Sequence, residues 1–372
     1  MVIGVPKEIH RHEHRVGLSP FAVHQLVTEG HTVFVEQGAG LSAHFSDKDF
    51  ERVGAQIVYG RREPYHRADL VCRVGRPSTE ELELLKPGGV IIAFQHLAVV
   101  PKANVDRFME LGATLIGYEV IRDAGGHSPV LAPFSEMAGQ MTIPLASHYL
   151  QAEKGGRGIL IGNVPGVPPA TVLVLGAGTV GVTAARSALY DGAHVVMMDH
   201  DMQKLRKASN ELLGRVVTLL ATEERLHRHT SIADVVIGAI LIPGERAPFL
   251  VTEEMVKHMK PGSVILDVSI DQGGCVETSR LATLDRPTFV QHGVVHYCVP
   301  NMTANVPRTA SRVLATAALP YVEALANKGV KEALRDDPGL AAGVFTFEGH
   351  LVHQGIGEHW DIPVKNLNDL LG

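Results

Sequence analysis

The pattern with the clearest chemical meaning is a glycine-rich hexapeptide, Gly176-Ala177-Gly178-Thr179-Val180-Gly181. In a dinucleotide-binding turn the first glycine permits the tight bend, the second lets a pyrophosphate approach the backbone, and the third lets helix and strand pack closely. The apolar run TVLVL precedes it, and VTAARSALYDGA, with helical character, follows. A helix starting there offers free N–H groups and its positive dipole end to phosphates. The hexapeptide predicts a nucleotide site, although an ordinary strand-to-helix turn could use the same glycines.

An acidic residue follows at the spacing that such a site requires. Asp199 lies about twenty residues further on, at the end of the apolar run HVVMMD. A carboxylate at this position accepts hydrogen bonds from the ribose hydroxyls and repels a 2′-phosphate. The sequence therefore favours NAD over NADP, a preference that a cationic His200 would weaken.

Two further residues could carry acid–base chemistry. His96 follows the apolar run VIIAF, and an imidazole titrates near neutral pH, although a hydrogen-bonded core histidine would look the same. Asp271 is expected to end a strand in SVILDVSID, where doubly wound sheets bind ligands beyond the carboxyl ends of their strands. The Gln-Gly-Gly after it also fits a simple turn.

The histidine-rich segment His10-Arg11-His12-Glu13-His14 lies directly before Arg15. Alternate residues of an extended segment point to one side, so the three histidines could hold a metal ion. We expect a solvated polar loop here instead, and no metal site.

These residues must be positioned by a chain of 372 residues, of which 45% are hydrophobic and 20% charged. Along this chain, short apolar runs alternate with amphipathic stretches. This pattern predicts an α/β protein with two doubly wound domains. We expect a central Rossmann domain at 131–306 and a discontinuous substrate (catalytic) domain from 1–130 and 307–372. A helix of about five turns, capped by Ser135, should connect them. We also expect a strand from Thr114 to Ile121 and a βα unit at FVQHGVVHYCV.

Composition narrows the possible partners. A net charge of −6 gives no basic face for a nucleic-acid backbone. The 3 cysteines, Cys72, Cys275 and Cys298, are too few and too far apart for a disulfide framework or a zinc knuckle. No apolar stretch reaches the roughly 18 residues that a membrane span needs. We expect a cytoplasmic protein with a small-molecule substrate and neither a membrane nor a nucleic-acid partner.

Several longer segments together resemble the alanine dehydrogenase family, which shares its fold with the nucleotide-binding part of proton-pumping transhydrogenase. They are GVPKEI, EHRVGLSP, FQHLA, LAPFSEMAG, PGVPPA with the glycine hexapeptide, GAILIPGERAP, MKPGSVILDVSIDQGGC and HYCVPNMTANVPRTAS. The resemblance implies NAD-dependent oxidative deamination of L-alanine to pyruvate and ammonia, and a homohexamer.

The resemblance also implies roles for single residues. Arg15 would hold the substrate carboxylate, His96 would be the general acid and base, and Asp271 would orient the water or ammonia. The positions that would line the cofactor, besides the glycine hexapeptide and Asp199, are Ser135, Lys204, Ile240, Leu241, Val299, Asn301 and Met302.

One position departs from the family pattern. The family has a lysine in a Val-Lys-Glu-Pro string, where it polarises the substrate carbonyl, but this chain reads Val74-Gly75-Arg76-Pro77. Arg73 and Arg76 flank the gap as candidate substrate-binding residues, and strand alternation favours Arg73, which should share the face of residue 75. Two alternatives stay open: a related dehydrogenase or imine reductase for another small amino acid or 2-oxo acid, and a weakened NAD-binding sensor or assembly protein.

Overall fold

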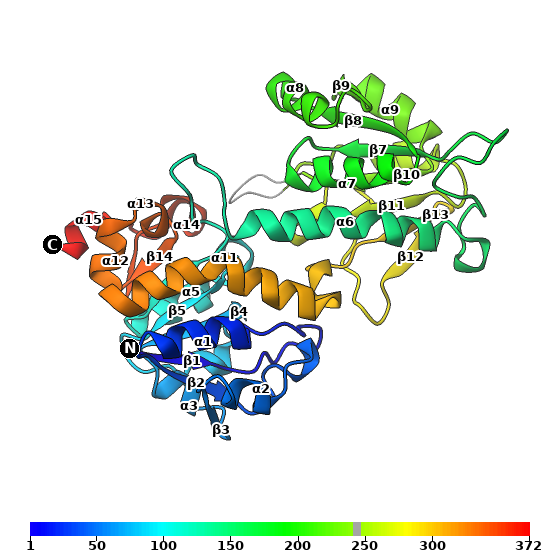
Figure 1. Cartoon of the computed structure of the whole chain (residues 1–372). Helices are drawn as coiled ribbons and strands as arrows, with labels where there is room; N and C mark the ends of the chain where they lie inside the picture. The colour runs from blue at the N-terminus through cyan, green and yellow to red at the C-terminus, as the bar shows by residue number, and fades with distance from the viewer. Residues whose placement is uncertain (241–246) are drawn as a thin grey trace. The chain divides into compact units, whose positions relative to one another are not determined.

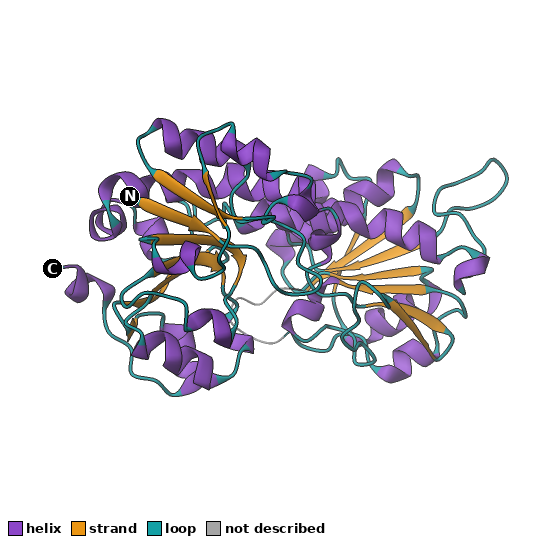
Figure 2. Cartoon of the chain, turned by 90° about the horizontal axis from the view of Figure 1, so that it is seen from below, coloured by secondary structure: helices purple, strands orange, loops and turns teal. Residues whose placement is uncertain are grey.

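The chain forms two compact units, each built around one sheet (Figures 1 and 2). A computed structural model describes residues 1–240 and 247–372. Unit 1 comprises Met1–Phe134 and Ala304–Gly372, and unit 2 comprises Ser135–Thr303. In both units most strands are parallel and alternate with helices along the chain. The predicted α/β class with two doubly wound domains is confirmed.

The sheet of unit 1 has the order β15-β14-β6-β5-β4-β1-β2-β3. Six strands are parallel, and β14 and β15 close one edge in antiparallel fashion. The central strands are buried and mainly apolar, as is typical of parallel strands covered on both faces, although one of them contains Arg73. Their bounds are β1 Val2–Val5, β2 Thr32–Glu36, β3 Gln56–Val58, β4 Leu70–Gly75, β5 Val90–Phe94, β6 Thr114–Gly117, β14 Val344–Phe347 and β15 His350–Leu351.

The expected strand from Thr114 to Ile121 is too long. It ends at Gly117, whose carbonyl accepts the N–H of Val120 in a turn, while its own N–H donates to Gly343. The turn puts Glu119 just beyond the carboxyl end of β6.

The helices of unit 1 come from both ends of the chain. The longest, α11, packs on α1 and buries an alanine- and leucine-rich face. The helices are α1 Pro20–Thr28, α2 Asp47–Glu51, α3 Glu63–His66, α4 Thr79–Leu82, α5 Lys102–Glu110, α11 Pro307–Lys328, α12 Val330–Asp336, α13 Pro338–Ala341, α14 Gln354–Trp360 and α15 Leu367–Leu371.

The sheet of unit 2 has the order β12-β13-β11-β10-β7-β8-β9, and only β12 is antiparallel to its neighbour. From β9 to β13 this is the strand order of a Rossmann fold, with its switch point between β7 and β10. The strands are β7 Thr171–Leu175, β8 His194–Asp199, β9 Val217–Leu220, β10 Val235–Gly238, β11 Val264–Asp267, β12 Thr288–Gln291 and β13 Val294–Tyr297. The helices between them are α7 Thr179–Tyr190, α8 Met202–Glu211, α9 Glu223–Ile232 and α10 Glu253–Lys257.

Two expectations for this part of the chain are wrong. FVQHGVVHYCV is a β-hairpin and not a βα unit, because His292 and Gly293 have φ values of 52° and 77° and form the kind of two-residue turn that joins antiparallel strands. Ser135 does not cap a helix, because α6 runs from Leu131 to Tyr149. Pro133 is tolerated in the first turn, where no N–H partner is lost, so the helix begins before the serine.

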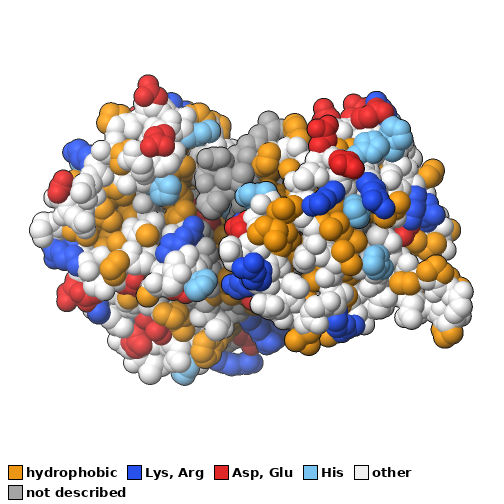
Figure 3. Space-filling view, turned by 90° about the horizontal axis from the view of Figure 1, so that it is seen from above, with side chains coloured by type: hydrophobic (Ala, Val, Ile, Leu, Met, Phe, Trp, Pro, Cys, Tyr) orange, Lys and Arg blue, Asp and Glu red, His pale blue; other side chains and the backbone are white. Residues whose placement is uncertain are grey.

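The surface carries mixed charge. Figure 3 shows acidic, basic and histidine side chains interspersed on the face in view. Among the described residues, no helix is long and apolar enough to cross a membrane.

A buried ion-pair network fixes the end of β4. The side chain of Arg73 is 0% exposed. It donates to Glu8 at 2.6 Å and to the hydroxyl of Tyr65 at 2.6 Å, and it pairs with Glu81 at 2.8 Å. Ser78 and Glu81 form the capping box of α4, so one carboxylate both starts a helix and neutralises the arginine. Burial raises the pKa of Glu81, but Arg73 and the hydrogen bonds around the carboxylate outweigh it, so the net pKa lies below its usual value.

The network also corrects the expected orientation of Arg73. Cys72 pairs with Ile92 and Gly75 pairs with Phe94, so β4 carries one extra residue between these two pairs. A bulge of this kind reverses the alternation of side chains. Gly75 therefore shares a face with Cys72, and Arg73 does not point to the side of residue 75.

We predict that Arg73→Met lowers the free energy of unfolding by about 3–5 kcal/mol, because it leaves two carboxylates buried without their cation. Urea denaturation measures the loss. The control is Arg107→Met, which removes an exposed pair with Glu110 on α5 and should cost at most about 1 kcal/mol. Equal losses in both variants would contradict this account of the network.

Candidate active site

The glycine hexapeptide of unit 2 forms a close turn between β7 and α7. Gly176 has a φ of 107°, and a Cβ there would lie 2.4 Å from the carbonyl oxygen of Ala239. A Cβ at Gly181 would lie 1.9 Å from the oxygen of Gly176. Gly178 differs, because its Cβ would meet nothing within 4 Å. Thr179 is exposed and Val180 half-buried in the first turn of α7, so open space adjoins the N–H groups of a helix start. This arrangement fits a pyrophosphate.

Asp199 ends β8 and supports the same turn. Its side chain is 5% exposed, and Oδ2 accepts the N–H of Ala177 at 2.8 Å while Oδ1 accepts the N–H of Asp201 at 2.9 Å. Nδ1 of His200 lies 3.3 Å from Oδ1. The carboxylate therefore holds the glycine turn against β8, a role that sequence analysis missed. Asp201 caps α8, which carries the exposed Lys204.

The other candidate cofactor positions of unit 2 lie in three segments. Ile240 follows β10 and donates its N–H to Ser269 at 2.9 Å. Val299 and Met302 are buried, and Asn301 between them donates its N–H to Asp271 at 2.8 Å. Ser135 is half-buried in α6. Leu241 lies outside the described residues.

Asp271 does not end a strand as expected. β11 ends at Asp267, and Asp271 lies in the 3₁₀ turn Val268–Gln272, with an exposed side chain. The buried carboxylate of Asp267 accepts N–H groups of Cys275 at 3.0 Å and Val276 at 3.2 Å, which closes the loop around this turn. Burial raises the pKa of Asp267, and these hydrogen bonds oppose the rise.

His96 lies at the carboxyl end of β5 in unit 1. Its φ is 46°, its ring stacks on Phe94 with centroids 6.0 Å apart, and its side chain is exposed. The carboxylate of Glu119 accepts the backbone N–H of His96 at 2.8 Å and that of Gln95 at 3.1 Å. Glu119 thus fixes the unusual backbone at His96. Its position at the end of the neighbouring strand was the available signal in the sequence.

Arg15 and His96 are joined by a row of aromatic rings. The guanidinium of Arg15, which is 3% exposed, lies 5.6 Å from the ring centroid of Phe134. The rings of Phe134 and Phe94 pack edge-on with their centroids 5.1 Å apart, and the ring of Phe94 stacks on that of His96. Arg15 donates from Nε to Glu13 at 2.7 Å. Unit 1 therefore brings one buried guanidinium and one exposed imidazole to the same region.

The two arginines beside Gly75 differ in their surroundings. Arg73 is fixed in the buried network described above, whereas Arg76 is half-buried just beyond the end of β4. Burial lowers the pKa of Arg76, and the negative charge of Glu119 opposes this. The charge of Glu119, which also holds the backbone N–H of His96, therefore acts on Arg76.

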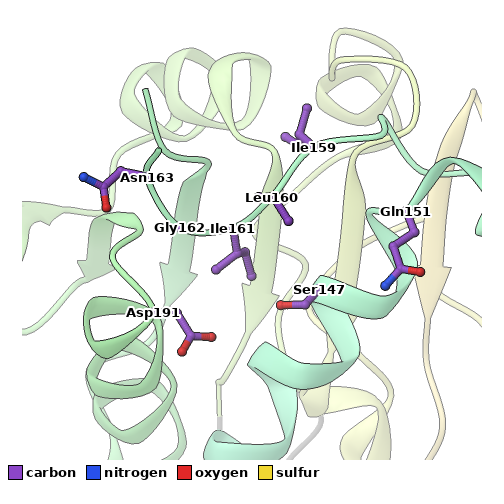
Figure 4. A pocket seen from close by; sticks show the side chains of 8 residues that line it. All are labelled: Ser147, Gln151, Ile159, Leu160, Ile161, Gly162, Asn163 and Asp191. Atoms are coloured by element: carbon purple, nitrogen blue, oxygen red, sulfur yellow. The ribbon is translucent and has the colours of Figure 1, made fainter. Parts of the chain in front are cut away.

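No metal centre emerges from the described part of the chain, where no group of three His, Cys, Asp or Glu side chains could hold an ion. One cavity of 290 Å³ opens in unit 2 (Figure 4). It is lined by Ser147, Gln151, Ile159, Leu160, Ile161, Gly162, Asn163 and Asp191. Asp191 follows the C-terminal end of α7, whereas Gly178 precedes its N-terminal end, so this cavity is separate from the glycine turn.

Comparison with known proteins agrees with this fold. Residues 4–138 match the family described as alanine dehydrogenase/PNT, N-terminal domain, and residues 142–354 match alanine dehydrogenase/PNT, C-terminal domain. The chain belongs to the alanine dehydrogenase/PNT family.

Individual relatives match the whole chain or nearly all of it. Alanine dehydrogenase of Mycolicibacterium smegmatis is 42% identical over 371 residues, which is 100% of both chains, and that of Mycobacterium tuberculosis is 42% identical over 98% of both. A solved L-alanine dehydrogenase superposes with a TM-score of 0.91 and 41% identity, over 97% of this chain and 99% of that one. A transhydrogenase from Sinorhizobium meliloti gives a TM-score of 0.82 and 26% identity, over 95% and 100%.

The two helix-side glycines provide a matched test of the nucleotide site. We predict that Gly178→Ala keeps the parental melting temperature but weakens NADH binding, because its methyl group enters the open space beside α7. Gly181→Ala should lower the melting temperature itself, because its methyl group meets the backbone of Gly176. Thermal unfolding and NADH fluorescence titration measure both effects. A Gly178→Ala variant with parental NADH affinity would contradict the assignment.

Proposed function

We propose that this chain catalyses the NAD-dependent oxidative deamination of L-alanine to pyruvate and ammonia, and the reverse reductive amination. The observation that carries the proposal is identity of 42% over the full length with curated alanine dehydrogenases. The placement of Arg15 and His96 in one region, and the open space beside Gly178, support it. The experiment that tests it is incubation with NAD⁺ and single amino acids while NADH absorbance is followed. No turnover of L-alanine, despite NADH binding, would favour the sensor hypothesis instead.

The reaction consumes L-alanine, NAD⁺ and water and yields pyruvate, ammonium, NADH and a proton. Arg15 would hold the α-carboxylate, which would take over the two parallel hydrogen bonds that Nε and Nη2 of Arg15 donate to Glu13 in the structure. His96 would take the proton that the amine and the attacking water release, since its ring is exposed at the carboxyl end of β5. Asp271 would orient the water. The chemistry that NAD supplies when bound is acceptance of the α-hydrogen as hydride.

The glycine turn, Ser135, Asp199, Lys204, Ile240, Leu241, Val299, Asn301 and Met302 would hold the dinucleotide. Unit 2 would then be the cofactor-binding domain and unit 1 the substrate-binding domain. The homohexamer and the cytoplasmic location stay predictions from the family resemblance.

We predict that His96→Ala lowers turnover by about 10²–10⁴-fold, because general acid–base catalysis contributes a factor of this size. NADH affinity should stay near its parental value, since the imidazole acts on substrate protons. Steady-state kinetics and an NADH titration measure the two quantities. Near-parental turnover would leave His96 with a packing role only.

We predict that the parental protein binds NADH more tightly than NADPH, because the carboxylate of Asp199 would lie beside the ribose and repel a 2′-phosphate. Asp199→Ala should reduce this preference. Since Asp199 also holds the glycine turn, the variant should lose some NADH affinity as well. Titrations with both dinucleotides provide the ratio. An unchanged ratio in the variant would exclude Asp199 as the selecting residue.

Gly75 stands where the family pattern has a carbonyl-polarising lysine. A side chain can begin there, because a Cβ at residue 75 meets no heavy atom within 4 Å outside its chain neighbours. We predict that Gly75→Lys raises the rate of pyruvate reductive amination by about 10²–10³-fold, by analogy with a charged donor at a developing oxyanion. Initial rates with pyruvate, ammonium and NADH measure the change. If the parental rate already matches lysine-containing relatives and Gly75→Lys changes nothing, this explanation of the missing lysine is wrong.

A further inference from the structure

The segment around Gly75 leaves defined space at the carboxyl end of β4. No heavy atom outside the neighbouring residues lies within 4 Å of the position that a Cβ would take. The backbone here is held firmly, because the N–H groups of Val74 and Gly75 donate to Glu8 at 2.7 and 3.4 Å. Glu8 is itself fixed by Arg73. The backbone around this space is therefore held in place by the network of Glu8 and Arg73.

The residue after Gly75 carries a cation. Arg76 makes no hydrogen bond or ion pair with any residue that the structure describes, although it is half-buried. The carboxylate whose charge it senses belongs to Glu119, which already accepts the N–H groups of Gln95 and His96. A partly desolvated guanidinium gains most from a carboxylate that pairs with it in two parallel hydrogen bonds.

The same strand ends carry the proposed catalytic groups of unit 1. Gly75 pairs with Phe94, so Arg76 follows β4 at the edge where His96 follows β5. Phe94 also packs against Phe134, and the guanidinium of Arg15 lies over the ring of Phe134. A substrate held by Arg15 and His96 would thus lie at the edge of the sheet that also carries residues 75 and 76.

We propose that Gly75 and Arg76 form a subsite for an acidic side chain, so that the enzyme also deaminates L-aspartate or L-glutamate. The inference rests on the proposed function. The bonds that change are those of L-alanine deamination: the α-hydrogen leaves as hydride to NAD⁺, water supplies the oxo oxygen, and ammonium and the 2-oxo diacid are released. The second carboxylate takes no part in the chemistry and pairs with Arg76.

The test compares each acid with its uncharged amide of nearly equal shape. We expect kcat/KM for L-aspartate or L-glutamate to exceed that for L-asparagine or L-glutamine by about 10- to 100-fold, the factor for one charged hydrogen-bonded partner. Arg76→Gln should abolish this ratio, and Arg76→Lys should keep part of it. Arg107→Gln, which removes an exposed arginine on α5, is the matched control and should keep the parental ratio.

Equal kcat/KM for acids and amides in the parental enzyme would overturn the subsite, and this comparison needs no variant to fold. An Arg76→Gln variant that loses L-alanine and acidic substrates in equal proportion would also overturn it, because Arg76 would then act on a group common to all of them. If L-alanine is turned over but the acids show no advantage, only this inference fails. If no amino acid is turned over, the proposed function fails.

Discussion

The guanidinium of Arg73 is closed off from solvent, and the edge of unit 1 that carries the candidate active site depends on how that charge is neutralised. Glu8 and Glu81 supply the two carboxylates, and each has a second task. Glu81 starts α4, and Glu8 holds the N–H groups of the strand end beside Gly75. An unpaired buried charge is costly, so the ion pairs restrain the backbone conformation at the end of β4. This arrangement also engages Arg73 in the structural network, whereas Arg76, the other arginine beside Gly75, lies outside that network.

Carboxylates hold backbone N–H groups at three of the candidate site segments. Glu119 fixes His96, Asp199 fixes the glycine turn, and Asp271 fixes Asn301. Charged acceptors make stronger hydrogen bonds than neutral ones, so they can hold backbone shapes that a loop would not keep alone, such as the positive φ of His96 and Asn301. We infer that these acids set the geometry on which substrate and cofactor binding depend.

Local patterns in the sequence were sufficient for the α/β class and for the glycine turn, because strand periodicity and glycine sterics act over a few residues. These local patterns gave wrong predictions where contacts with residues distant in the sequence determine the structure. The bulge between Cys72 and Gly75 reverses the alternation that favoured Arg73, and it is visible only in the pairing with β5. The start of α6 before Ser135 depends on tolerance of Pro133, and the hairpin at His292-Gly293 depends on two positive φ values. The role of Glu119 required knowledge that β5 and β6 are neighbours.

The central claim is that the α-hydrogen of an amino acid leaves as hydride to NAD⁺ within this protein. The direct measurement uses L-alanine deuterated at the α-carbon, with NMR analysis of the NADH that forms. The account predicts deuterium at one face of the nicotinamide C4 position and a slower rate with the labelled substrate whenever hydride transfer limits turnover. NADH formed from labelled alanine without deuterium at C4 would contradict it.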